Sequence, residues 1–267
     1  MKAHLKITIL GCGTSNGIPI LACECSVCLS DNPLNKRTRS SVLITRLDHS
    51  KNIVIDTSPD FRSQMLNSGV KSLEHVLYTH THADHCHGFD DLRVFYFKHK
   101  KHVNCWLSEE HLLEFQKRFS YAFQERHFMD NKPQVQTRSF HSGKPFEVEG
   151  LMVHPVLVPH GLEKTTAFRI GSFVYATDFK TIPEDTISSW QGKIHTMIAS
   201  GVGFKEQYAT HSSVAETVRL FQRLGVQRGI ITHLSHEVDY GRDAALLPPH
   251  VCFAHDGMSL ELEIDNV

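Results

Sequence analysis

The fold of this chain is decided by the stretch Tyr78-Thr79-His80-Thr81-His82-Ala83-Asp84-His85-Cys86-His87-Gly88. The apolar run His75–Thr79 is typical of a buried strand. Four potential metal ligands leave the end of that strand, namely His80, His82, Asp84 and His85. In an extended loop, side chains two residues apart point the same way, so His80 and His82 can converge on one ion. Asp84 and His85 then turn toward a second ion, which predicts a two-metal centre.

A histidine-rich surface loop is the ordinary alternative, because the chain contains 20 histidines and an isolated histidine seldom binds metal. Clusters of histidine without a function rarely carry an aspartate in register, and they rarely follow a strand directly. The order of the four residues therefore favours the metal centre.

Composition sets the broad class of the protein. A chain of 267 residues without a linker-like segment can bury a sizeable core, so we expect a single domain over residues 1–267. The net charge of −1 provides no global positive field, which makes nucleic acid an unlikely partner. The apolar run Leu5–Leu10 is too short for a signal peptide and predicts a first strand. No stretch approaches the ~20 apolar residues of a membrane span, so we expect a cytoplasmic protein without a membrane partner.

Three of the seven cysteines form a C-x-C-x-x-C cluster, which we call the cysteine knuckle (Cys23, Cys25 and Cys28). Three thiolates at this spacing can share one tetrahedral zinc ion, and His236 is our candidate for the fourth ligand. The alternative is a loop with three reduced thiols. Crowded exposed thiols are prone to oxidation, which a bound metal prevents, so the sequence favours a structural zinc site.

Further potential ligands also follow predicted strands. The three places are Leu151–Val158 before His160, Phe173–Thr177 before Asp178, and Gly229–Thr232 before His233. Taken singly, each residue is more typical of a turn. Together they fit the remaining ligands of a dinuclear site, with His160 on the first ion, Asp178 bridging and His233 on the second. His236 follows three residues after His233, so one loop would join both metal sites.

Other segments predict the framework around these sites. We expect strands at Ser41–Thr45, Asn52–Ile55, Ile194–Ala199 and Met258–Ile264. We expect helices from Ser58 with Pro59 at the first position to Gly69, from Ser108 to Phe119, and from the capping box at Ser213 to Gly225. The segment Tyr121–Pro133 is expected to be irregular.

Two features near the expected strand ends have less specific interpretations. Asp56 ends a strand, where its carboxylate could orient a metal-bound histidine or cap a turn. The glycine-rich loop Gly11–Gly17 lacks the spacing of the common phosphate-binding motifs, so we assign it no nucleotide and expect it to pack near the metal loop.

In order along the chain, H-x-H-x-D-H, V-P-H-G, T-D and T-H-L-S-H resemble the ligand motifs of the metallo-β-lactamase superfamily. This resemblance implies an α/β fold, the αββα sandwich of two mixed β-sheets flanked by helices, with the ligands on loops at one edge. The opening G-C-G-T-S-x-G-x-P, the cysteine knuckle and the late histidines are similar to the phosphodiesterase branch typified by PhnP.

The resemblance also implies the roles of individual residues. One divalent ion, Mn²⁺ or Zn²⁺, is held by His80, His82 and His160, a second by Asp84, His85 and His233, and Asp178 bridges them. The implied structural Zn²⁺ is held by Cys23, Cys25, Cys28 and His236. His211 falls where the family places a histidine beside the substrate phosphate, and we expect His211 and Asp84 to be catalytic. The expected reaction is hydrolysis of a small cyclic phosphodiester, such as 5-phosphoribosyl 1,2-cyclic phosphate, by a water bridged between the ions, and a homodimer is plausible.

Three alternatives remain at this point. A tRNA 3′-end processing nuclease shares the chemistry, but it needs a basic arm, and the chain has no long glycine- and lysine-rich insertion. A hydrolase of thioesters or lactones uses similar ligands, and an accessory protein of the same fold needs no chemistry. In Ile194–Ser200, where relatives tend to place acidic residues, the chain has His195 and Ser200, so we expect altered pocket contacts.

Overall fold

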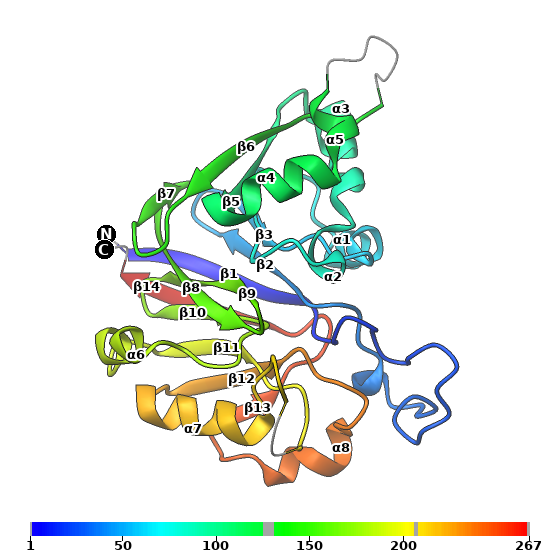
Figure 1. Cartoon of the computed structure of the whole chain (residues 1–267), viewed down its shortest axis with the longest axis vertical. Helices are drawn as coiled ribbons and strands as arrows, with labels where there is room; N and C mark the ends of the chain where they lie inside the picture. The colour runs from blue at the N-terminus through cyan, green and yellow to red at the C-terminus, as the bar shows by residue number, and fades with distance from the viewer. Residues whose placement is uncertain (1, 125–130, 206–207, 266–267) are drawn as a thin grey trace.

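The protein is described by a computed structural model that covers residues 2–124, 131–205 and 208–265. Within this part of the chain, the strands form two seven-stranded sheets that face each other, and helices cover the outer face of each sheet (Figure 1). The layers confirm the predicted αββα sandwich with two mixed sheets. Residues 125–130 of the segment expected to be irregular lie outside the described residues.

The first sheet has the strand order β14-β1-β2-β3-β4-β5-β6. Pairing is antiparallel from β14 to β3 and parallel from β3 to β6. The strands are β1 (Lys2–Gly11), β2 (Ser41–Arg46), β3 (Lys51–Ile55), β4 (His75–Leu77), β5 (Val103–Ser108), β6 (Val135–Phe140) and β14 (Ser259–Asp265). Because β3 to β6 run in one direction, the loops that follow them leave from one edge of the sheet.

The second sheet has the order β13-β12-β11-β10-β9-β8-β7. Pairing is antiparallel from β7 to β10 and parallel from β10 to β13. The strands are β7 (Phe146–Val148), β8 (Leu151–His160), β9 (Glu163–Ile170), β10 (Phe173–Ala176), β11 (Thr196–Ser200), β12 (Arg228–Thr232) and β13 (Val251–Phe253). The strand β8 runs in the same direction as β10, so His160 comes to the edge at which β10 and β12 end.

Helices connect the strands on both outer faces. The α-helices are α1 (Phe61–Ser68), α2 (Ala83–Cys86), α3 (Arg93–His99), α4 (Glu109–Arg118), α5 (Ser120–Phe123), α6 (Glu184–Trp190), α7 (Val214–Leu224) and α8 (Tyr240–Asp243). Three 3₁₀ turns are η1 (Pro33–Asn35), η2 (Phe89–Leu92) and η3 (Ala244–Leu246). No helix among the described residues is both long enough and apolar enough to cross a membrane.

The core lies between the sheets because the inward-facing residues of the strands are apolar. In β1, Leu5, Ile7 and Ile9 are fully buried and belong to the central apolar cluster, while the residues between them face outward. Each such side chain contributes about 1.5–3 kcal/mol of burial free energy. Two further clusters lie under the helices, and α7 packs Phe221 and Leu224 against the second sheet. Packing on both faces of each sheet therefore fixes the edge from which the site loops emerge.

Most predicted elements are present, with several corrections. The helix expected to start at Pro59 begins at Phe61, with Asp60 as its N-cap. The hydroxyl of Ser58 instead accepts from the Asp60 N–H and donates to Gln64, which holds a turn ahead of the helix. Helix α5 extends from Ser120 to Phe123 and so occupies the start of the segment expected to be irregular. The strand expected over Ile194–Ala199 begins at Thr196 and extends to Ser200.

Candidate metal centre

Imidazole and carboxylate groups from both sheets meet at the edge where the strands end. Three overlapping groups have ligand atoms within 4.8 Å of one another: His80, His82 and His160; His80, His85 and Asp178; and Asp178, His211 and His233. The loop after β4 supplies the first histidines, and β8, β10 and β12 deliver His160, Asp178 and His233. The structure thus brings together the residues that the sequence analysis placed in one centre.

Asp178 lies at the middle of this cluster. Its Oδ2 is 2.5 Å from His85 Nε2, and its Oδ1 is 2.9 Å from His233 Nε2 and 3.2 Å from His211 Nε2. Asp84 approaches from the first sheet, with Oδ2 3.2 Å from His85 Nε2. A carboxylate whose two oxygens face different histidines has the placement that the bridging prediction requires.

Hydrogen bonds on the far side of the rings orient His80 and His85. His85 Nδ1 donates to Asp56 Oδ2 over 2.7 Å. His80 Nδ1 lies 3.0 Å from the hydroxyl oxygen of Thr79, and that hydroxyl donates to the same Asp56 oxygen over 2.8 Å. Both rings therefore carry their proton on Nδ1 and leave Nε2 free as a ligand atom. Of the two interpretations of Asp56, the structure supports the orienting role.

The other histidines are held in similar ways. His160 Nδ1 donates to the Thr210 carbonyl over 3.1 Å, and His233 Nδ1 lies 3.2 Å from the hydroxyl oxygen of Ser40. His82 is turned the opposite way, because its Nε2 lies 2.9 Å from Glu163 Oε2. That contact leaves Nδ1 of His82 as its available ligand atom.

The backbone at the site is strained. Asp56, Asp178 and His233 have positive φ angles of 66°, 51° and 55°, in the left-handed region that residues other than glycine rarely adopt. Such a conformation costs of order 1–3 kcal/mol for each residue and persists where the surrounding structure imposes it. Asp56 and His233 directly follow β3 and β12, and Asp178 lies two residues after the end of β10, so each strained turn directs its side chain toward the site.

The atoms at the centre of the cluster match what a cation needs. His80 Nε2, His85 Nε2 and both oxygens of Asp178 are buried and have no hydrogen-bond partner within the part of the chain that the structure describes. Leaving polar atoms buried and unpaired costs roughly 1–3 kcal/mol each, and more for charged groups. Imidazole nitrogen and carboxylate oxygen are ligands of Mn²⁺, Zn²⁺ and Fe²⁺. The residues present therefore fit divalent metal ions.

The pKa shifts of the two carboxylates and of His80 suit metal binding. Burial opposes a charge on His85, but Asp178 and Asp84 raise the pKa of its imidazole, so a metal ion would have to displace that proton. Burial opposes the charge of Asp84, but the neighbouring His85 lowers the pKa of Asp84 to about 2. Burial likewise opposes the charge of Asp178, while His233 and His85 hold its pKa well below the ordinary range. Burial lowers the pKa of His80, so its imidazole stays neutral. Ionised carboxylates and a neutral imidazole are the protonation states that bind metal.

The cysteine knuckle forms a second cluster with His236. The sulfur atoms of Cys23, Cys25 and Cys28 lie 3.3, 3.6 and 3.7 Å from His236 Nδ1. A tetrahedral zinc ion with ~2.3 Å to sulfur and ~2.0 Å to nitrogen separates such atoms by about 3.5 Å. The backbone N–H of Cys28 lowers the pKa of Cys25 to about 6, which favours its thiolate. The geometry fits the predicted zinc ligands, and the dark-blue segment that carries the knuckle extends away from the sheets (Figure 1).

Two residues singled out from the sequence have different positions. His211 joins the centre, since its Nε2 faces Asp178 and its Nδ1 lies 2.8 Å from the Thr210 hydroxyl oxygen. His195 precedes β11 and is exposed at the opposite end of that strand. The expectation that His195 and Ser200 share a pocket is therefore wrong, because the length of the strand separates them. Ser200 alone reaches the site edge, where it pairs in register with Thr232.

Sequence reasoning missed the residues that orient the ligands, namely Ser40, Thr79, Glu163 and Thr210. Thr79 and Thr210 are adjacent in sequence to His80 and His211, so a hydroxyl beside each predicted ligand was the available signal. Ser40 and Glu163 come to the site from distant segments, and nothing in their local sequence indicates this contact.

Comparisons with known proteins agree with this geometry. A family model described as a β-lactamase superfamily domain matches residues 51–234. An octanoyltransferase of Porphyromonas gingivalis (strain ATCC BAA-308 / W83) is 32% identical over 264 residues, which are 98% of this chain and 52% of the relative. The chain thus spans about half the length of that curated relative.

Two solved structures extend the comparison. A crystal structure described as a new diphosphatase from the PhnP family is 32% identical, covers 99% of both chains and superposes with a TM-score of 0.90. Zn²⁺-bound PqqB from Methylobacterium extorquens is 19% identical, with 96% of this chain and 100% of PqqB covered and a TM-score of 0.78, and it shares the fold. With the family model over most of the site loops and this whole-chain similarity, the chain belongs to the metallo-β-lactamase superfamily and is PhnP-like.

Proposed function

We propose that this protein is a metal-dependent hydrolase that cleaves a small phosphodiester, such as 5-phosphoribosyl 1,2-cyclic phosphate. The observation that carries the proposal is the convergence of buried, unpaired ligand atoms on Asp178 with His211 beside them. The similarity to a PhnP-family protein over the whole chain supports the same class of reaction.

Under this proposal, two divalent ions occupy the centre. His80, His82 and His160 would hold one, and Asp84, His85 and His233 would hold the other, with Asp178 as a ligand that both could share. Cys23, Cys25, Cys28 and His236 would hold a structural zinc ion. When bound, the two ions supply Lewis-acid activation of water and compensate the charge that develops on the phosphoryl group. Asp56 fixes the ring of His85 so that its Nε2 faces the centre.

We assign His211 the role of proton donor to the leaving group. Its side chain is 26% exposed, whereas His80 and His85 are fully buried, so His211 faces the solvent side from which a substrate arrives. With Nδ1 held at the Thr210 hydroxyl, Nε2 is the atom that can donate a proton to the departing oxygen. General-acid catalysis of this kind contributes roughly 10²–10⁴-fold in rate.

The test is ³¹P NMR of the manganese-loaded protein with 5-phosphoribosyl 1,2-cyclic phosphate, followed as the cyclic diester signal converts to that of a monoester. We expect metal-dependent conversion, and we expect His211→Ala to lose about 10²–10⁴-fold in turnover with unchanged metal content. Wild-type protein that carries its metals and leaves the diester intact contradicts the proposed substrate. Unchanged turnover in His211→Ala removes this histidine from the mechanism.

A diphosphate is the second candidate substrate, because the PhnP-family protein of 32% identity is described as a diphosphatase. Hydrolysis of a diphosphate needs the same activated water and the same proton donor. The NMR assay distinguishes the two when ADP is supplied in parallel, since cleavage of its anhydride releases inorganic phosphate.

The remaining alternatives have less support. The name of the P. gingivalis relative refers to octanoyl transfer, so an octanoyl thioester belongs in the assay panel as a test of acyl hydrolysis. A nuclease would have to bind a polyanion with a chain whose net charge is −1. Cleavage of the thioester alone would replace the phosphodiesterase proposal.

A further inference from the structure

A hollow of about 240 Å³ opens between the candidate metal centre and the cysteine knuckle. His211 and His233 line its inner side, and His236 lines the side toward the knuckle. One wall comes from the glycine-rich loop through Thr14, Ser15 and Asn16, and the other from Val202 and the segment 235–237. A group bound here would lie directly beside the phosphate that His211 contacts in the proposed reaction.

The backbone of the loop wall is fixed by hydrogen bonds. Thr14 N donates to the Leu234 carbonyl over 3.2 Å, and Gly17 N donates to the Thr14 carbonyl over 2.8 Å. Gly13 also bridges both Arg39 and Leu234, so the loop is held between the segments that carry Ser40 and His233. This confirms the expected packing of the glycine-rich loop against the metal loops. The side chains of the loop are therefore presented at fixed positions.

Those side chains have unused hydrogen-bonding capacity. Thr14 is only 9% exposed, yet its hydroxyl has no hydrogen bond to another described residue. The side chains of Ser15 and Asn16 are exposed and likewise make none within residues 2–124, 131–205 and 208–265. A hydroxyl that lines a hollow, and whose hydrogen-bonding capacity no protein group uses, is available to a ligand bound there.

The opposite wall supplies an acceptor. Glu237 Oε2 accepts from the Tyr208 hydroxyl over 2.5 Å, and its Oε1 pairs with Lys205 over 2.6 Å. A carboxylate has about four acceptor positions, so it can also accept from a hydroxyl in the hollow. Its negative charge disfavours a second anionic group beside it. The hollow thus combines donors and acceptors for an uncharged, hydroxyl-bearing group.

We propose that this hollow binds the ribose ring of the substrate, with the charged 5-phosphate directed away from Glu237, and that Thr14 and Asn16 determine specificity for the ring. The proposal rests on the phosphodiesterase function proposed above and adds the part of the substrate beyond the phosphate. Typical small-molecule pockets measure roughly 300–1,000 Å³, so a hollow of about 240 Å³ suits one ring rather than a nucleic acid chain.

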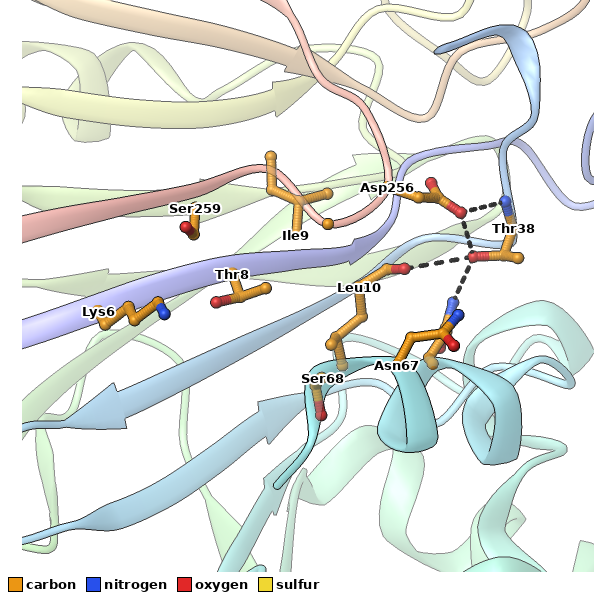
Figure 2. A pocket seen from close by; sticks show the side chains of 11 residues that line it. Lys6, Thr8, Ile9, Leu10, Thr38, Asn67, Ser68, Asp256 and Ser259 are labelled. Carbon is orange, nitrogen blue, oxygen red and sulfur yellow. Dashed lines mark hydrogen bonds between the residues drawn. The ribbon is translucent and has the colours of Figure 1, made fainter. Parts of the chain in front are cut away.

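A second hollow provides matched control positions. Figure 2 shows the side chains that line a hollow over β1 and α1, among them Thr8 and Asn67. The volume of this hollow is about 340 Å³. Its lining includes none of the predicted metal ligands. Thr8 and Asn67 therefore allow the same chemical substitutions as Thr14 and Asn16, away from the centre.

The experiment measures steady-state kinetics of Thr14→Val and Asn16→Ala with two substrates. One substrate is 5-phosphoribosyl 1,2-cyclic phosphate, and the other is bis(4-nitrophenyl) phosphate, which has no hydroxyl group. Each variant should raise KM for the ribosyl substrate by about 3- to 10-fold with kcat nearly unchanged, because one hydrogen bond to bound substrate is lost. Kinetics with bis(4-nitrophenyl) phosphate and metal content should stay at the wild-type values. The controls Thr8→Val and Asn67→Ala should match wild type with both substrates.

Every other outcome overturns the inference in a recognisable way. If both substrates showed the same change in KM and kcat, Thr14 and Asn16 would support the structure of the metal centre rather than recognise the sugar. Unchanged kinetics with the ribosyl substrate would show that the sugar binds elsewhere. Metal-loaded wild-type protein that cleaves neither substrate would overturn the proposed function itself and this inference with it.

Discussion

Replacement of the fully buried Asp56 by asparagine should weaken metal binding more than it weakens the fold. Asp56 accepts three hydrogen bonds, from Thr79 N and Thr79 Oγ1, each over 2.8 Å, and from His85 Nδ1 over 2.7 Å. In Asp56→Asn, one of the two oxygens becomes an NH₂ group, which then faces a donor. Asparagine tolerates the positive φ of this position, so the substitution acts through the hydrogen bonds rather than the backbone.

The expected magnitude follows from those contacts. A buried donor left without an acceptor costs about 1–3 kcal/mol of stability. Loss of the partner that orients a metal-bound histidine typically lowers metal affinity by about 10–100-fold, or about 1.4–2.7 kcal/mol. At a fixed excess of metal, the rise in Tm that metal produces should therefore shrink by about 3–10 °C.

The assay combines metal competition with a chelator and thermal unfolding, each with and without added Mn²⁺. Asp256→Asn is the matched control, because Asp256 is partly buried and also accepts three hydrogen bonds, from Cys12 N and from Thr38 N and Thr38 Oγ1, and it is not among the predicted metal ligands. Figure 2 shows its contact with Thr38. This control variant should lower Tm equally in both forms and leave chelator competition unchanged. The reasoning is refuted if Asp56→Asn competes with chelator like wild type, or if both variants lose the same metal affinity.

Two more predictions concern the knuckle and the response to pH. Cys25→Ser should lower Tm, while the protein that remains folded keeps its turnover per dinuclear site, because the knuckle lies apart from the reacting groups. Cys252→Ser serves as the control. If Cys25→Ser has the Tm of wild type, the cysteines of the knuckle are free thiols. Burial lowers the pKa of His75, whose Nδ1 accepts from Trp106 Nε1 over 3.0 Å. The neutral imidazole therefore contributes stability at neutral pH. This stability is lost as pH falls below about 6.5 and through the lowered pKa of the folded state. Urea unfolding of wild type and His75→Asn at pH 7.5 and 5.0 checks this, and an equal pH dependence in the two proteins would exclude His75 as a source.

The sequence predicted correctly those elements whose stabilising interactions lie within one short segment. The capping box at Ser213 and the glycine that ends α7 at positive φ are both present as expected, because these interactions join residues within one or two turns. The strands before the predicted ligands were recognisable from their apolar runs. The ligands themselves could be predicted because each directly follows such a strand.

The remaining features depend on contacts between distant segments. Strand β9 was not predicted, so the position of Glu163 beside His82 was not predicted either. Ser40 reaches His233 only after the first sheet has packed against the second. The error over His195 has the same origin, since the sequence does not show which end of a strand faces the site.

The predicted metal ligands are divided between the two sheets, so metal binding depends on the packing of the sheets against each other. His80, His82, Asp84 and His85 emerge from the first sheet, whereas His160, Asp178 and His233 emerge from the second. An intermediate in which only one sheet is formed would hold half of the cluster. Separation of the sheets would therefore release a bound ion, and a bound ion would add a cross-link between the two sheets to the apolar core that already joins them.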